Sequence, residues 1–157
     1  MNTRLLVLLA SAGSLALLAG AFAFQYLGGL APCHLCLLQR WPHAAAVLIG
    51  VIVLATRQTV LAWLGACAAA TTAAIGLYHT GVERGWWEGP SSCTSSGTGG
   101  MTADQLFDQI MNAPLIRCDE VAWSLLGLSM ASWNALIALV LTAIWILAAQ
   151  RGRAQSS

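Results

Sequence analysis

The chain has 157 residues, of which 58% are hydrophobic and 8% are charged, with a formal net charge of +1 and no lysine. A soluble domain carries roughly 25% charged residues. The composition therefore excludes a soluble globular protein, a disordered chain and a nucleic-acid-binding protein with a basic patch. All six acidic residues lie between Glu83 and Glu120. The long uncharged segments elsewhere predict an integral membrane protein.

Four of these uncharged segments predict membrane spans. A helix needs about 20 apolar residues to cross a hydrocarbon core of about 30 Å. The expected spans of a single transmembrane domain, 1–157, are at about residues 5–24, 41–57, 60–79 and 122–149. The outer loops then lie at about 25–40 and 80–121. We expect an all-α integral membrane protein, a four-helix transmembrane bundle with two outward-facing loops.

The first span could be a cleaved signal peptide, because Arg4 precedes it and Ala21-Phe22-Ala23 resembles a cleavage site. Its uncharged segment is longer than the hydrophobic region of an ordinary signal peptide, which has about 7–15 residues. We therefore expect a retained span.

The arginines predict the orientation of the bundle. One side would carry four of them and no carboxylate: Arg4, Arg57, Arg151 and Arg153. Since short basic segments stay in the cytoplasm, both termini are expected to be cytoplasmic. Trp63 and Trp145 lie toward the inner ends of their spans, as in an interfacial aromatic belt.

The second outer loop is expected to have two parts. Residues 90–100 are rich in serine and glycine, which is typical of a flexible tether. Residues 102–112 predict a short amphipathic helix, because Thr102 and Gln105 form a capping box and Pro114 prevents its continuation.

Four of the five cysteines fall in the expected outer loops: Cys33, Cys36, Cys93 and Cys118. Disulfides form and persist outside the cytoplasm. Cys67 lies within the third span and is most simply a small packing residue.

Three interpretations of the four loop cysteines compete. They could be structural disulfides, a metal site with His34 as a further ligand, or two redox-active pairs that exchange electrons. The C-x-x-C spacing of Cys33 and Cys36 favours redox chemistry, because it brings two sulfurs to reacting distance. Arg40 follows Cys36 by four residues at the membrane boundary, where an arginine snorkels or binds a partner such as a quinone carbonyl.

Several motifs together resemble the disulfide bond formation protein B (DsbB) family. They are Pro32-Cys33-His34-Leu35-Cys36-Leu37-Leu38-Gln39-Arg40, Tyr78-His79-Thr80, Gly89-Pro90-Ser91-Ser92-Cys93, Arg117-Cys118-Asp119 and Trp123-Ser124-Leu125-Leu126-Gly127-Leu128-Ser129-Met130. The resemblance extends from Pro32 to about Asn134. Gln39 departs from the pattern of those members that have an acidic residue there.

The resemblance implies a thiol:quinone oxidoreductase of the bacterial inner membrane that sustains disulfide bond formation. Such an enzyme reoxidises a periplasmic, DsbA-like thioredoxin-fold dithiol oxidase. It passes the electrons to an exchangeable quinone, either ubiquinone or menaquinone. Neither a metal nor a nucleic acid is implied.

The resemblance also implies roles for individual residues. Cys93 forms the mixed disulfide with the partner oxidase, and Cys118 is its disulfide mate. Cys33 accepts electrons from the second loop, and Cys36 contacts the quinone as a thiolate. Arg40 binds the quinone head group, and His79 matches a histidine near the quinone. The alternative is a non-catalytic membrane protein whose disulfides only brace its loops.

Overall fold

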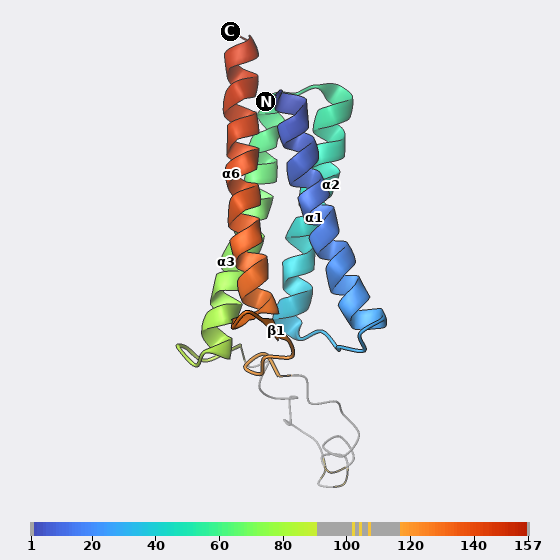
Figure 1. Ribbon diagram of the computed structural model, residues 1–157, viewed down its shortest axis with the longest axis vertical. Helices are drawn as coiled ribbons and strands as arrows, with labels where there is room; N and C mark the ends of the chain where they lie inside the picture. Colours follow the sequence, from blue (N-terminus) through green and yellow to red (C-terminus); the bar gives the residue numbers. More distant parts are fainter. Residues whose placement is uncertain (1, 91–101, 103, 105–106, 108–116, 157) are drawn as a thin grey trace.

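The computed structural model describes residues 2–90, 102, 104, 107 and 117–156. Within this part of the chain, four long helices form one bundle (Figure 1). They are α1 (Thr3–Tyr26), α2 (His34–Thr56), α3 (Ala62–Glu83) and α6 (Met130–Ser156). Each contains a segment long and apolar enough to cross a membrane. The predicted four-helix transmembrane fold is confirmed.

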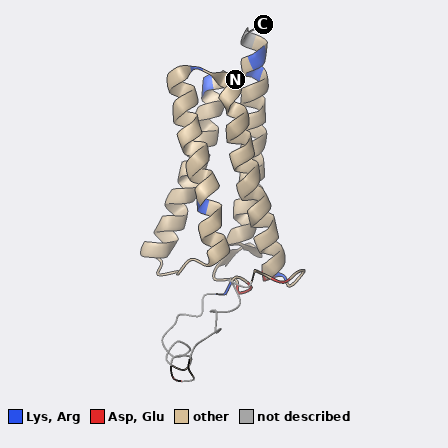
Figure 2. Cartoon of the chain, turned by 180° about the vertical axis from the view of Figure 1, so that it is seen from behind, with Lys and Arg blue, Asp and Glu red and all other residues tan. Residues whose placement is uncertain are grey.

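Both termini lie at one end of the bundle, and the connections that carry the cysteines lie at the other (Figure 1). Among the described residues, the acidic ones lie at the cysteine end, whereas arginines occur at both ends and are the charged residues seen at the end with the termini (Figure 2). At the terminal end, α2 stops at Arg57, whose φ of 60° is left-handed. The short helix η1 (Thr59–Leu61) then leads directly into α3.

The half of the bundle nearer the two termini, here called the terminal half, is packed around Trp145 of α6. The side chain of Trp145 is fully buried. Gly65 of α3 lies so close that a Cβ on it would stand 2.6 Å from the indole ring. A Cβ on Gly50 of α2 would likewise collide with the Ser11 side chain of α1. Small residues permit this close approach of helices. The prediction that Trp145 belongs to an interfacial belt is therefore wrong.

The second helix begins earlier than predicted. The sequence placed its start near residue 41, but α2 begins at His34 and so includes residues 34–40 of the predicted loop 25–40. Pro42 lies inside the helix rather than in its first turn. The helix starts at its actual position because the Cys33 side chain caps it, with its sulfur accepting a hydrogen bond from the backbone N–H of Cys36.

The fourth helix begins later than predicted, at Met130 rather than near residue 122. A small antiparallel hairpin occupies the intervening residues, with β1 (Ser124–Leu125) paired to β2 (Leu128–Ser129). Leu126 and Gly127 form its turn with φ values of 53° and 77°. Two successive positive φ values are typical of the tight turn that joins twisted strands. At the same end, α3 continues to Glu83, past the predicted limit of residue 79.

The predicted amphipathic helix at 102–112 lies largely outside the described residues. Of that segment, Thr102, Asp104 and Phe107 are described, and the latter two have helical backbone conformation.

Candidate functional site

The two cysteines of the C-x-x-C motif lie at the start of α2. Their sulfurs are 2.6 Å apart, and both cysteines are free. The hydrogen bond with the Cys36 sulfur, together with burial, raises the pKa of the Cys33 thiol. The raised pKa favours the protonated thiol of Cys33 over its thiolate. This geometry suits a pair that opens and closes a disulfide.

Cys118 of the second loop packs against the same motif. Its side chain is fully buried and shares an apolar cluster with Cys33, Leu35 and Val82. Cys118 is in a disulfide, whereas the three other described cysteines are free. Cys93 lies outside the described residues, so its pairing with Cys118 stays a prediction. The fold thus brings a disulfide of the second loop next to the free pair of the first.

His79 of α3 lies between these two groups of cysteines. Its Nε2 is 3.6 Å from the Cys33 sulfur and 3.9 Å from Glu83 Oε1. The backbone of Cys118 is a further hydrogen-bond partner of the ring. Glu83 in turn accepts a hydrogen bond from the hydroxyl of Ser129, the last residue of β2 before α6. The His79 ring therefore connects the first loop, the second loop and α3.

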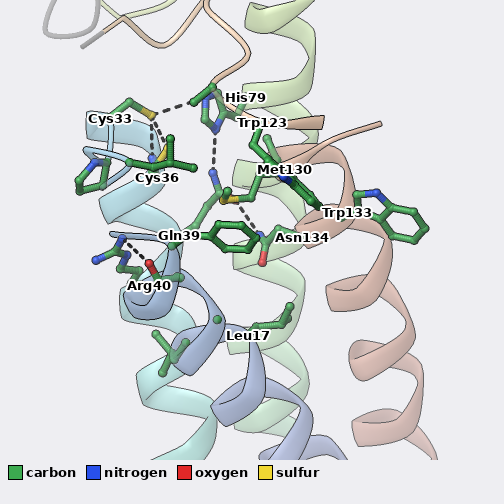
Figure 3. Close-up of a pocket in the computed structure, with 18 of the residues that line it drawn as sticks. Leu17, Cys33, Cys36, Gln39, Arg40, His79, Trp123, Met130, Trp133 and Asn134 are labelled. Carbon is green, nitrogen blue, oxygen red and sulfur yellow. Dashed lines mark hydrogen bonds between the residues drawn. The ribbon is translucent and has the colours of Figure 1, made fainter. Parts of the chain in front are cut away.

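A cavity of about 310 Å³ extends from the cysteines into the bundle (Figure 3). Its walls are largely apolar and come from α1, the hairpin and α6, with Leu17, Phe24, Trp123 and Met130 among them. Polar side chains line one part of it: Cys33, Cys36, Gln39, Arg40, His43, His79 and Asn134. An apolar ligand with a few polar groups fits such a site.

Arg40 lines this cavity and extends toward α1 rather than toward solvent. Its Nη1 donates to Gln25 Oε1 at 2.6 Å, and its Nη2 donates to the Ala21 carbonyl at 3.4 Å. The guanidinium also lies over the Phe22 ring, 4.8 Å from its centroid. Its Nε is buried and has no hydrogen-bond partner among the described residues. One donor of Arg40 is thus still available beside the cavity.

A network of buried polar side chains contacts His79 on its Nδ1 side. Gln39 Nε2 lies 3.0 Å from His79 Nδ1 and donates to the Leu35 carbonyl at 3.2 Å. Asn134 of α6 donates to Gln39 Oε1 at 2.7 Å. His43 Nε2 lies 2.9 Å from Asn134 Oδ1. The network joins α2, α3 and α6 across the centre of the cysteine half, that is, the end of the bundle around Cys33, His79 and Asn134 (Figure 3).

The comparison with known families decides what kind of protein carries this site. The family model of disulfide bond formation protein DsbB matches residues 3–148. The chain belongs to the DsbB family. It is therefore a membrane protein of disulfide bond formation.

Curated DsbB proteins are similar over most of their length. Disulfide bond formation protein B 2 of Pseudomonas aeruginosa is 31% identical over 145 residues, which cover 88% of this chain and 84% of the relative. Disulfide bond formation protein B of Hahella chejuensis is 32% identical over 143 residues and covers 84% of both chains. The protein of the same name from Verminephrobacter eiseniae is 33% identical over 157 residues, which cover 90% of this chain and 85% of the relative. No solved structure matches with comparable significance.

The residues that the sequence singled out for this DsbB family member fall into two groups. Cys33, Cys36, Arg40 and His79 all line the cavity, and Cys118 packs beside it. His34, considered as a metal ligand, is exposed, and the histidine that accompanies the two free sulfurs is His79. Cys67 is also exposed on its helix, so it is not the internal packing residue expected.

Sequence reasoning missed Gln39, Asn134 and Glu83. Glu83 follows His79 by four residues, and this spacing places both side chains on one face of a helix, so the pattern could have revealed it. Gln39 and Asn134 are 95 residues apart. No local pattern of the sequence brings these two residues together.

Proposed function

We propose that this DsbB family member is a thiol:quinone oxidoreductase that reoxidises a periplasmic, DsbA-like thioredoxin-fold dithiol oxidase. Two pairs of cysteines carry the electrons, Cys93 with Cys118 and Cys33 with Cys36, and an exchangeable quinone accepts them. The observation that carries the proposal is the packing of Cys118 against the C-x-x-C motif beside an apolar cavity.

The proposed transfer consists of two thiol–disulfide exchanges. After the partner oxidase has reduced the second-loop pair, a thiolate of that pair attacks the Cys33 sulfur. A mixed disulfide forms, the bond between Cys33 and Cys36 breaks, and Cys36 leaves as a thiolate. The other second-loop thiolate then attacks the mixed disulfide and releases Cys33. Two electrons have moved to the C-x-x-C pair, and the second-loop disulfide is restored.

The cavity fits a quinone in size and chemistry. Its largely apolar walls suit a ring and an isoprenoid tail, and the unpartnered Nε of Arg40 is a donor that a carbonyl group would satisfy. Cys36 lines the same cavity one helical turn before Arg40. A bound quinone accepts two electrons and two protons. The protein residues hold the head group, direct the Cys36 sulfur toward it and exclude water.

The proposed location is the bacterial inner membrane, with both termini in the cytoplasm and the cysteines facing the periplasm. The distribution of arginines supports this orientation, because the end with the termini carries Arg4, Arg57, Arg151 and Arg153 without a carboxylate. An oxidising compartment is also the place where the second-loop disulfide would persist.

Quinone reduction by the purified protein, with a reduced thioredoxin-fold donor, tests the proposal. Turnover should require both the donor and a soluble ubiquinone or menaquinone analogue. In Cys118→Ala, a mixed disulfide of the donor with Cys93 should accumulate on a non-reducing gel, because its resolving thiol is absent. If the disulfides only brace the loops, the donor reduces nothing, no adduct forms, and the proposal is wrong.

A further inference from the structure

The hydrogen bonds around Gln39 determine which way its amide faces. A backbone carbonyl can only accept, so the Gln39 atom 3.2 Å from the Leu35 carbonyl is the nitrogen. On the other side of the amide, Asn134 Nδ2 donates to Gln39 Oε1 at 2.7 Å. Reversing the amide would place two acceptors together at Leu35 and two donors together at Asn134. The orientation is therefore fixed at both ends.

The orientation of the Asn134 side-chain amide is fixed in the same way, by a residue of α3. Its Nδ2 also lies 3.3 Å from the Thr72 hydroxyl oxygen. That hydroxyl donates to the backbone carbonyl of Gln39 at 3.1 Å, so its oxygen can accept from Asn134. The Asn134 nitrogen thus faces α2 and α3, and its oxygen faces His43. Two independent sets of bonds impose the same direction on the Gln39 amide.

The direction of this amide decides the state of His79. The side-chain nitrogen of Gln39 can only donate a hydrogen bond. His79 Nδ1, which lies 3.0 Å from it, must therefore accept that bond. In a neutral imidazole one nitrogen accepts and the other carries the proton. The proton of His79 is therefore on Nε2, the atom that lies 3.6 Å from the Cys33 sulfur.

We propose that Gln39 is a positioning residue that fixes His79 in the tautomer with its proton on Nε2, the nitrogen that faces both the Cys33 sulfur and the backbone of Cys118. The inference rests on the proposed function for its role in turnover, but the tautomer itself does not. With its lone pair on Nδ1 and not on Nε2, His79 acts at this site as a hydrogen-bond donor. It does not present a free nitrogen to a metal beside the sulfurs.

This donor has a specific use when Cys33 is released. In the second exchange, the bond between Cys33 and a second-loop cysteine breaks, and its electron pair stays on Cys33. Cys36 is by then already a thiolate, so the new charge forms beside one of the same sign. A hydrogen bond from His79 Nε2–H stabilises the Cys33 thiolate and makes it a better leaving group.

The change Gln39→Glu tests the proposal, because an ionised carboxylate of nearly the same shape cannot donate to Nδ1. The proton of His79 should move to Nδ1, and Nε2 should become unprotonated. Nitrogen-15 NMR of histidine-labelled protein distinguishes protonated from bare ring nitrogens directly. The reduced, detergent-solubilised full chain should show Nε2–H in the unaltered protein and Nδ1–H in Gln39→Glu.

A second variant, in α6, alters the hydrogen bonding of the same Gln39 amide. Asn134→Asp places an acceptor opposite Gln39 Oε1, which favours the reversed amide and hence the Nδ1–H form of His79. Gln58→Glu is the matched control, because it makes the same chemical change in the exposed turn at the terminal end. The control should leave the spectrum of His79 unchanged. An unaltered protein with Nδ1–H, or tautomers unchanged in both site variants, overturns the inference.

The rate provides the functional measurement. Electron transfer from the reduced second-loop pair to Cys33, followed by quenching and thiol trapping, should slow by about 10- to 150-fold in Gln39→Glu, the rate equivalent of one hydrogen bond to a charged group. The KM for the protein donor should not change, because the donor reacts at Cys93. A reversed tautomer with an unchanged rate overturns the role of Gln39. Absence of quinone reduction in the unaltered protein, with the tautomer as expected, contradicts the proposed function and leaves the tautomer assignment intact.

Discussion

The two halves of the bundle are built from the same four helices but are packed in opposite ways. In the terminal half, glycines and alanines let the helices close around Trp145. In the cysteine half, the helices leave a cavity of about 310 Å³ and share a chain of hydrogen bonds through Gln39 and Asn134. Close packing gives rigidity, and the cavity gives access to the sulfurs. Changes in the two halves should therefore have separable consequences.

The largest effect is expected at Cys36. In Cys36→Ser, quinone reduction should fall below detection, because a hydroxyl can neither form the disulfide with Cys33 nor act as a thiolate. The unfolding temperature in detergent should stay nearly the same, since the shape of the side chain is conserved. Steady-state assays and thermal unfolding measure the two quantities. Cys67→Ser, on an exposed face of α3, is the matched control and should keep full activity.

Arg40 should give the next largest effect. Loss of a hydrogen bond to a charged group costs about 1.5–3 kcal/mol, so kcat/KM for quinone should fall by about 10- to 150-fold in Arg40→Ala. Arg40→Lys should raise the quinone KM, because it keeps the charge and loses the planar fork. Varying each substrate in turn should show a smaller change in the KM for the protein donor.

The competing explanation for Arg40 is that it only snorkels to the interface. Lysine should then substitute freely, and alanine should affect insertion or stability instead of kinetics. Unchanged quinone kinetics in Arg40→Ala would exclude a role at the head group.

A pair of glycine substitutions compares the two halves directly. Gly65→Ala places a methyl group against the Trp145 ring in the terminal half and should lower the free energy of unfolding by about 1–3 kcal/mol. Gly20→Ala is the matched change on α1 beside the cavity, where a Cβ has no neighbour within 4 Å. It should leave stability unchanged or slightly higher, since alanine favours helix. Denaturant titration in detergent measures both, and equal losses would contradict the difference in packing.

The smallest effect concerns the mouth of the cavity. Arg117 donates to Asp119 in a two-point ion pair and holds the pKa of that carboxyl below its usual range. The contribution to stability is present above the pKa of the unfolded chain and is lost as pH falls through the lower, folded value. Because both side chains are exposed to solvent, the loss should be small. An NMR titration of Asp119 in Arg117→Gln should show its pKa returning toward the ordinary value, and an unchanged pKa would show that the pair has no effect.

The sequence alone was sufficient to locate the four membrane spans, but it did not predict the residues at which the helices begin and end. Uncharged length located the four spans, because only apolar helices are stable in hydrocarbon. The start of α2 was missed because Pro42 is typical of a first turn, whereas the cap is the Cys33 sulfur. The start of α6 was missed because the hairpin around Leu126 and Gly127 is as apolar as the helix that follows.

The site was predictable where its residues form local motifs. Cys33, Cys36 and Arg40 lie within a single segment, so their proximity follows from the sequence alone. His79 came from the family resemblance. The bond between Gln39 and Asn134 exists only because α2, α3 and α6 meet, and no spacing along the chain encodes that meeting. The burial of Trp145 has the same origin, since a tryptophan near a helix end fits both a belt and a core.

The length of α6 has a consequence for how deep the protein sits in the membrane. Its 27 residues extend about 40 Å, which is more than the hydrocarbon thickness of about 30 Å. At the terminal end, the guanidinium of Arg153 lies 5.3 Å from the centre of the Trp63 ring, and both groups favour the head-group layer. This cation–aromatic pair resists sliding of the bundle along the membrane normal. It therefore favours a depth at which the cavity, at the other end of the bundle, lies in the opposite leaflet near the membrane surface.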